Sequence, residues 1–204
     1  MPDSRRKEAR LQTLMADFII SLDGYGAADG WPGLWGMQGP EYLAWLEEQE
    51  AHAALMGATT YRLLSEIAQT MPDEPGVAQM TAMPKVVFSS TAQKPLAWAN
   101  TQLIRGDAVE AVREMKRTSD LPLRTLGSIS LCRSLLRAGL VDRYRVVVFP
   151  VINGATGRDR IFDGYPDVRL DLVQHRVFDG RLQLLEYVPT VLDAPPGGGA
   201  SPAA

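Results

Sequence analysis

Three short segments rich in glycine and hydroxyl side chains stand where an apolar run gives way to a helical pattern. They are Gly57-Ala58-Thr59-Thr60, Ser89-Ser90-Thr91 and Gly127-Ser128-Ile129-Ser130. A helix that begins at such a junction directs free backbone N–H groups and its positive dipole end beyond the strand, where an anion binds well. Such residues also simply turn the chain and cap helices, so one junction alone is ambiguous. Three junctions in one chain favour a ligand that carries phosphate, such as a pyrophosphate.

Other common chemistries find little support in the sequence. The Rossmann, P-loop, nucleophile-elbow and zinc-protease motifs are all absent. His52 and His175 lie far apart within expected regular structure, so we expect structural roles for both and no metal site. Cys132 is the single cysteine; it lies on the apolar face of a helix, where a free thiol behaves as a small core residue.

Length, charge and hydropathy narrow the class of protein. The chain of 204 residues has 21 basic and 24 acidic residues, a net charge of −3, which argues against nucleic acid as a partner. No apolar run approaches the roughly 20 residues that cross a bilayer, and the amino terminus lacks a secretion signal, so we expect no membrane association and a cytoplasmic location. One domain is expected over residues 11–192, with flexible tails at 1–10 and 193–204.

The elements that must position the three junctions alternate between strand and helix. We expect strands at 14–21, 53–56, 85–88, 101–105 and 123–126, and helices at 40 to about 50, 59–67, 108–115 and 130–138. Strands that alternate with helices pair mainly in parallel. The loop at 24–39 is long for a compact domain, and we expect ligand contacts there.

The last third of the sequence changes character. A β-branched run covers 144–151, and two β-prone runs, 168–178 and 181–188, flank Asp179-Gly180. An Asp-Gly pair in this setting is a strong hairpin signal. The predicted fold class is therefore α/β, with a mixed, mostly parallel central sheet and an antiparallel C-terminal hairpin.

Several motifs occur in an order and spacing that is more specific than any one of them. They include Ser21-Leu22-Asp23-Gly24-Tyr25, Met56-Gly57-Ala58-Thr59-Thr60-Tyr61, Pro84-Lys85-Val86-Val87-Phe88-Ser89-Ser90, Leu126-Gly127-Ser128-Ile129-Ser130-Leu131 and Pro150-Val151-Ile152-Asn153-Gly154. Over about residues 15–188 the chain resembles the dihydrofolate reductase superfamily, closest to bacterial reductases similar to the riboflavin-biosynthesis (RibD) C-terminal reductase domain. This resemblance implies a three-layer α/β/α fold of the dihydrofolate-reductase type.

The resemblance also implies NADPH as the cofactor and hydride transfer to a small heterocyclic substrate, pterin-like or pyrimidine-like. The implied cofactor-binding residues are Gly26 and Ala27 beside the nicotinamide, Gly57, Thr59, Thr60, Phe88, Ser89, Ser90 and Thr91 around the adenosine half, and Gly127, Ser128, Ile129, Ser130 and Leu131 at the pyrophosphate. Tyr25 and the tryptophans of the first loop would exclude water. Relatives of this kind are often homodimers. The alternative is a non-catalytic nucleotide-binding regulatory or interaction module on the same fold.

Two departures from the family pattern bear on the cofactor. Ala58 stands where relatives commonly have an arginine, which removes a cation for a 2′-phosphate. NADH is therefore the alternative cofactor, and Lys94 and Arg105 are the candidate substitutes for the missing charge. Ser128 replaces the second of two glycines, and its hydroxyl would either donate to a phosphate or crowd it.

Two carboxylates are candidates for catalysis. Glu41 lies in the first turn of a helix, 16 residues before Gly57, at a place comparable to the carboxylate of dihydrofolate reductases. It would either orient the substrate ring and assist proton delivery, or only complement the helix N-terminus from solvent. Asp23 also has two possible roles: its carboxylate would either face the substrate or form the turn with Gly24.

Overall fold

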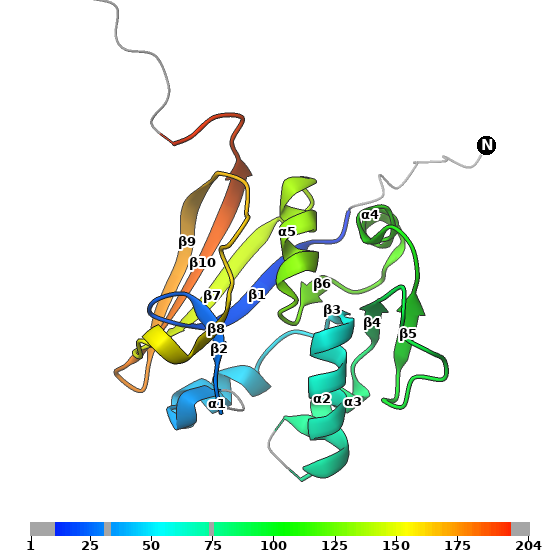
Figure 1. Cartoon of the computed structure of the whole chain (residues 1–204), viewed down its shortest axis with the longest axis horizontal. Helices are drawn as coiled ribbons and strands as arrows, with labels where there is room; N and C mark the ends of the chain where they lie inside the picture. The colour runs from blue at the N-terminus through cyan, green and yellow to red at the C-terminus, as the bar shows by residue number, and fades with distance from the viewer. Residues whose placement is uncertain (1–10, 31–33, 74–75, 197–204) are drawn as a thin grey trace, which may run out of the picture.

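An eight-stranded sheet forms the centre of the protein (Figure 1). The computed structural model describes residues 11–30, 34–73 and 76–196. The sheet order is β5-β4-β3-β6-β1-β7-β10-β9. In chain order its strands are β1 (Leu14–Ser21), β3 (Ala53–Gly57), β4 (Lys85–Phe88), β5 (Thr101–Ile104), β6 (Leu123–Thr125), β7 (Arg143–Phe149), β9 (Val168–Phe178) and β10 (Leu182–Val191).

The sheet is mixed but mostly parallel, as the sequence predicts. Every neighbouring pair from β5 to β7 is parallel, and β10 and β9 then add antiparallel to β7 and to each other. Residues 179–181 connect β9 to β10, and Phe178 pairs with Leu182 across the connection. Asp179 and Gly180 have φ values of 51° and 65°, the positive values of a type I′ turn, and the Arg181 N–H closes this turn on the Phe178 carbonyl at 2.9 Å. A separate two-stranded sheet pairs β2 (Tyr25–Ala28) with β8 (Gly157–Arg160).

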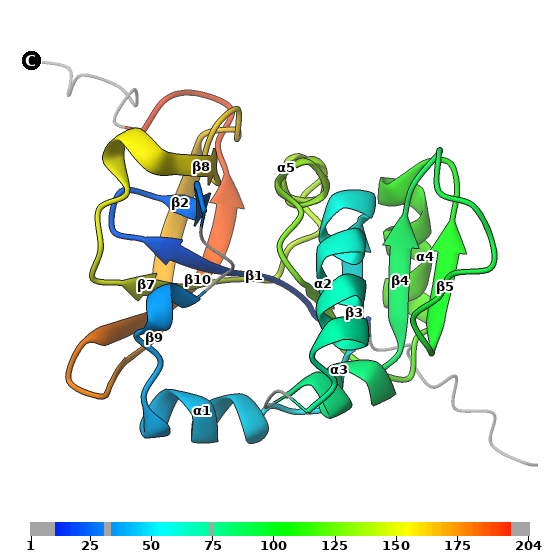
Figure 2. The same ribbon diagram turned by 60° about the horizontal axis from the view of Figure 1, so that its bottom comes forward.

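Helices cover both faces of the sheet, which confirms the three-layer fold. Side chains of β3 alternate between two clusters: Leu55 packs with residues of α4 (Ala108–Thr118) and α5 (Ile129–Arg137), whereas Met56 packs with Tyr61 of α2 (Ala58–Thr70). The face with Met56 also carries α3 (Val77–Ala82) and α1 (Pro40–Glu47). Figure 2 shows α1 below β7 and β10, and α2 and α3 beside β3 and β4.

Several local expectations need correction. The first helix ends at Glu47 rather than near residue 50. The second begins at Ala58 rather than Thr59, and no side chain caps its start. The 24–39 segment is not all loop, because it contains β2 and a short 3-10 helix, Leu34–Gly36. By contrast, Asp107 caps α4, since its side chain accepts hydrogen bonds from the N–H groups of Val109 and Glu110.

Two further expectations concern the membrane and the two tails. No helix among the described residues is long and apolar enough to cross a membrane. The expected tails at 1–10 and 193–204 lie outside the described residues except for 193–196.

Candidate nucleotide-binding site

The three small-residue turns lie along one edge of the sheet. They follow β4, β3 and β6, which are consecutive parallel strands, so their carboxyl ends meet at the same edge. Gly57 and Phe88 are register partners, which places the first two turns side by side. The Leu126 N–H donates to the Leu55 carbonyl at 2.9 Å, which brings the third turn next to the first.

Ser128 connects two of these turns directly. Its hydroxyl accepts a hydrogen bond from the Gly57 N–H at 2.6 Å and lies 2.8 Å from the Thr60 hydroxyl. Ser128 has a φ of 68°, a left-handed conformation that is unusual for a residue with a side chain. A Cβ atom on Gly57 would lie 3.3 Å from the Ser128 hydroxyl, so this glycine allows the close approach. Ser128 therefore forms a bridge between the two turns.

The second turn is followed by a loop that runs to β5, so the expected helix after it is wrong. The turn is stabilised by its own serine. The Ser89 hydroxyl accepts hydrogen bonds from the N–H groups of Thr91 and Ala92, at 3.3 and 3.0 Å. Arg105 donates to the carbonyl of Ala92 at 2.7 Å and so ties the same loop to the end of β5. Ser90 and Thr91 remain exposed at the edge of the sheet.

The starts of α2 and α5 present backbone donors beyond this edge. Neither helix has a side-chain cap in the described part of the chain, whereas α4 is capped by Asp107. The first N–H groups of an α-helix have no partner within the helix. In α5 these belong to Ile129, Ser130 and Leu131, since the first bond back to the turn is from Cys132 to the Ser128 carbonyl. The edge therefore offers donors for an anion.

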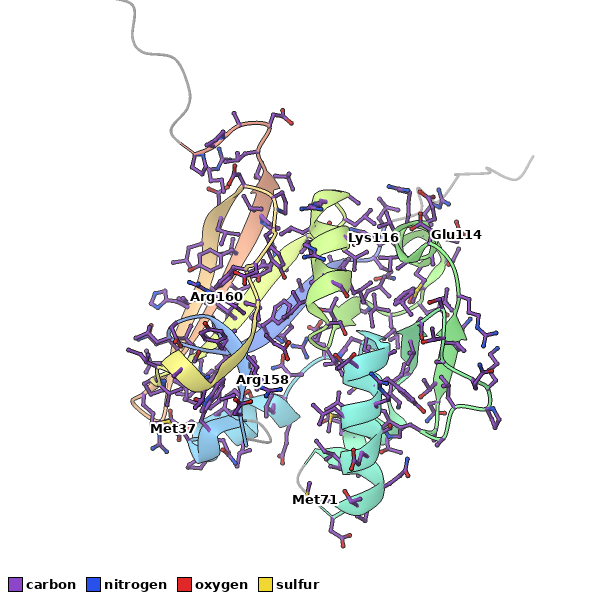
Figure 3. The ribbon with its side chains drawn as sticks, viewed as in Figure 1. Met37, Met71, Glu114, Lys116, Arg158 and Arg160 are labelled. Atoms are coloured by element: carbon purple, nitrogen blue, oxygen red, sulfur yellow. The ribbon has the colours of Figure 1, made fainter. Side chains whose placement is uncertain are left out.

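The two predicted nicotinamide neighbours lie elsewhere, in the two-stranded sheet that follows β1. Gly26 and Ala27 are half-buried in β2, and Ala27 pairs with Arg158 of β8. Figure 3 shows Arg158 and Arg160 along β8, where Arg158 forms an ion pair with Asp29 and Arg160 lies 6.0 Å from the Tyr25 ring. Trp31, one of the tryptophans expected to exclude water, lies outside the described residues.

Glu41 is exposed at the start of α1 and contacts the hairpin turn. Its carboxylate accepts a hydrogen bond from the Asp179 N–H at 2.6 Å. Asp179 in return accepts from the N–H groups of Glu41 and Tyr42, at 3.1 and 3.3 Å. The α1 start is thus capped by a residue far along the chain.

Asp23 closes the turn between β1 and β2. It accepts hydrogen bonds from the Ser21 hydroxyl at 2.6 Å and from the N–H groups of Asn153 and Gly154 at 3.2 and 3.0 Å. These hydrogen bonds, that of Ser21 first, lower the pKa of Asp23 to about 2. Asp23 is therefore a structural tie between two loops in this structure.

A charged row that the sequence analysis did not single out crosses the sheet beneath α1. Asp17 of β1 pairs with Arg145 of β7 at 2.8 Å and with Arg124 of β6 at 3.2 Å. The Gln49 side-chain oxygen accepts from both arginines, and Arg145 lies 4.8 Å from the Trp45 ring. The available signal was the presence of Asp17, Arg124 and Arg145 within three strands of mostly uncharged residues.

This row borders a cavity of about 370 Å³, a size suited to a small molecule. Trp45, Gln49, Arg124 and Arg145 line it, together with several acidic residues. Neither Glu41 nor Asp23 is among its lining residues. Burial, and then the charge of Asp17, raise the pKa of the nearby Tyr42 hydroxyl, which keeps it neutral at physiological pH.

Of the two histidines, His52 is among the residues that line the cavity beneath α1, whereas His175 and Cys132 are not. His175 is exposed on β9, and His52 contacts the Glu50 carbonyl at 2.8 Å. Burial raises the pKa of the Cys132 thiol to about 12, so it is not a nucleophile at neutral pH. Among the described residues, no group of three or more His, Cys, Asp or Glu side chains is arranged to hold a metal ion.

Comparison with known families shows to which protein family this chain belongs. The model of the RibD C-terminal domain matches residues 12–184, which is most of the chain. The chain belongs to the RibD C-terminal domain family. Comparison with curated protein sequences gave no significant match.

Solved structures similar to this RibD C-terminal domain show the same fold at low identity. A putative riboflavin biosynthesis protein from Shewanella sp. PV-4 has 19% identity, a TM-score of 0.65, and coverage of 87% of this chain and 99% of the other. A pyrimidine reductase-like protein from Corynebacterium diphtheriae has 16% identity, a TM-score of 0.59, and coverage of 88% of this chain and 92% of the other. A dihydrofolate reductase from Enterococcus faecalis, complexed with NADP(H), has 14% identity, a TM-score of 0.58, and coverage of 87% of this chain and 96% of the other.

Proposed function

We propose that this chain is an NADPH-dependent reductase that transfers hydride to a small heterocyclic substrate of the pyrimidine or pterin kind. The observation that carries the proposal is the row of three turns, joined by the Ser128 hydroxyl, at one edge of parallel strands. Membership of the RibD C-terminal domain family supports it, as does the fold shared with a dihydrofolate reductase complexed with NADP(H). A cytoplasmic location is part of the same proposal.

The residues at the edge of the sheet fit the phosphates of a dinucleotide. The uncapped starts of α2 and α5 supply backbone N–H groups, and the small side chains of Gly57, Ala58 and Gly127 leave room beside them. When bound, NADPH would supply the hydride. This chain would supply the phosphate-binding N–H groups and the loop at Gly26 and Ala27 that limits water at the nicotinamide.

Titration of the full chain with NADPH, followed by tryptophan fluorescence, tests cofactor binding. We expect saturable quenching or energy transfer at micromolar cofactor. The absence of binding at millimolar NADPH would overturn the proposal, because every later step depends on the cofactor.

One substitution tests whether the start of α2 binds a phosphate. Ala58 is the first residue of α2, and Gly57 before it has φ −86° and ψ 171°, a conformation compatible with a following proline. Ala58→Pro therefore removes one N–H without breaking the helix, and we expect NADPH binding to weaken about 10-fold. Ala108→Pro is the matched control at the start of α4, where Asp107 already provides the cap. Equal effects of the two substitutions would argue against phosphate binding at α2.

The cavity beneath α1 does not suit the substrate of this reaction. Its lining includes Met15 and Leu123 at the starts of β1 and β6, whereas the three turns follow the ends of their strands, so the cavity lies at the opposite edge of the sheet. Hydride donor and acceptor must be in contact, so the proposed substrate site lies beside Gly26 and Ala27, next to the proposed position of the nicotinamide.

Glu41 and Asp23 remain the proposed catalytic carboxylates. Glu41 is exposed at the start of α1, where a ligand can reach its carboxylate. We expect Glu41→Gln and Asp23→Asn to lower kcat for reduction of a pyrimidine or pterin substrate while NADPH affinity stays unchanged. A non-catalytic nucleotide-binding module would bind NADPH, reduce none of these substrates and be indifferent to both substitutions.

We also propose that the protein is a homodimer through β9, the outer strand of the sheet. Its outer backbone edge has no strand beside it in the described chain, and Leu170, Leu172, Val173 and Val177 are 40–55% exposed. Long exposed apolar edge strands are usually covered in soluble proteins. Light scattering after size exclusion should give twice the chain mass, and Leu172→Asp should give the monomer. A monomeric native chain would contradict this.

A further inference from the structure

A groove of about 350 Å³ lies between α2 and the loop that follows β4. Residues at helical spacing form its first wall, and the loop forms the second. The lining residues are Ala58, Tyr61, Arg62, Ser65, Thr91, Ala92, Gln93, Pro95, Leu96 and Ala97. Two of the three small-residue turns thus open into this groove, one at Ala58 and the other at Thr91.

The charge of the lining favours an anion. Arg62 is the only charged residue among the lining residues, and the other polar groups are hydroxyls and one amide. The cavity beneath α1 differs, because three glutamates line it in addition to its arginines. A site with one guanidinium, nearby hydroxyls and no carboxylate suits a phosphate group.

Arg62 is available to a ligand. Its side chain is exposed, and its one hydrogen bond within the described chain is a long contact of 3.4 Å to the Thr59 hydroxyl. Arg113 and Arg117 on α4, by comparison, each form an ion pair with a glutamate on the same helix. The contact with Thr59 directs Arg62 back toward the start of α2.

Both walls of the groove are held in place. The Tyr61 hydroxyl accepts a hydrogen bond from the Trp98 N–H at 3.2 Å, which fixes the aromatic ring within the core. Arg105 holds the opposite loop through the Ala92 carbonyl, so its guanidinium has a positioning role. Lys94, the other expected substitute for the missing cation, is not among the lining residues.

We propose that Arg62, with Thr91 and Gln93, binds the 2′-phosphate of NADPH and makes the chain select NADPH over NADH. This inference rests on the proposed function. In this proposal Arg62 has the role that the sequence analysis gave to Lys94 and Arg105. Arg62 lies one helical turn beyond Ala58, on the same face of α2. The small side chain of Ala58 leaves the approach to Arg62 open.

Calorimetric titration of the full chain with NADP⁺, NAD⁺ and adenosine 2′,5′-bisphosphate tests this without any turnover. We expect NADP⁺ to bind about 10- to 100-fold more tightly than NAD⁺, the size of a charge-assisted hydrogen-bond pair. Adenosine 2′,5′-bisphosphate should compete with NADP⁺ more strongly than 5′-AMP does. The preference should weaken as salt is added, because Arg62 is exposed.

Substitution of Arg62 then separates the selectivity from the fold. Arg62→Ala should remove most of the preference for NADP⁺ and leave NAD⁺ affinity unchanged, Arg62→Lys should retain part of it, and Arg62→Glu should reverse it. Arg117→Ala on α4 is the control and should change neither affinity. Thermal melts should confirm that an exposed substitution leaves the protein folded.

The outcomes distinguish the two proposals. If native protein binds NADP⁺ and NAD⁺ equally, or if Arg62→Ala weakens both to the same degree, the role of Arg62 is wrong while cofactor binding stands. If native protein binds neither dinucleotide, the proposed function fails and the role of Arg62 fails with it.

Discussion

Glu41 and Asp179 exchange hydrogen bonds between carboxylate and backbone although 138 positions separate them in the chain. Each side chain accepts from the other residue's N–H, so the first turn of α1 and the β9–β10 hairpin turn hold one another. The residue at the N-cap of α1 is Gly39, which has no side chain to provide a cap. A distant aspartate provides it instead.

Gly39 and Asp179 should show strong energetic coupling. A Cβ atom on Gly39 would lie 2.2 Å from the Asp179 carboxyl carbon, although the backbone of Gly39 suits any residue. We expect Gly39→Ala and Asp179→Ala each to lower the free energy of unfolding by about 1–2 kcal/mol. In urea denaturation the double variant should lose clearly less than the sum, because the clash disappears with the carboxylate. Additive losses would contradict the contact.

At position 128 we expect glycine to destabilise the protein less than alanine does. Alanine keeps the strained left-handed backbone and leaves the Gly57 N–H without its acceptor, whereas glycine relieves the strain. We therefore expect Ser128→Gly to be more stable than Ser128→Ala by about 1 kcal/mol. Chemical denaturation of the two variants measures this difference. A more stable alanine variant would show that the positive φ carries no strain.

Asp23 should make stability depend on pH in acid. Its pKa in the folded protein, about 2, is below the ordinary value of 3.8 because Ser21 and two backbone N–H groups bind the carboxylate. A lowered carboxyl pKa contributes stability that is complete above about pH 4 and is lost as the pH falls toward 2. Native protein should therefore lose more stability than Asp23→Asn over this window in urea titrations. Parallel loss in both proteins would exclude the contribution.

Lys116 should be a stabilising tie between α4 and the loop before β7. It is buried, forms an ion pair with Asp142 and donates to the Leu140 carbonyl at 2.9 Å; Figure 3 shows it on the side of α4 that faces α5. Asp142 also accepts from the Leu14 N–H at 2.7 Å. We expect Lys116→Met to lower the free energy of unfolding by about 1–3 kcal/mol. Arg117→Ala, an exposed neighbour, is the control and should lie within about 0.5 kcal/mol of native protein.

Much of the fold could be predicted because it depends on local pattern. The apolar runs and the Asp179-Gly180 turn each act over a few residues, and each is where the sequence places it. β2 and β8 were missed because they pair with each other rather than with the central sheet. Glycine and alanine make up most of β2 and have low strand propensity, and β8 is mostly charged.

The sequence by itself determined the turn residues and the order of strand and helix that sets them at the ends of strands. Only the tertiary structure decided which groups meet: Ser128 with Gly57, Asp179 with Glu41, and Arg62 with the loop after β4. The reason is physical. Turn and helix preferences arise from interactions within a few residues, whereas these contacts depend on strand order and on the packing of α1 and α2 against the sheet.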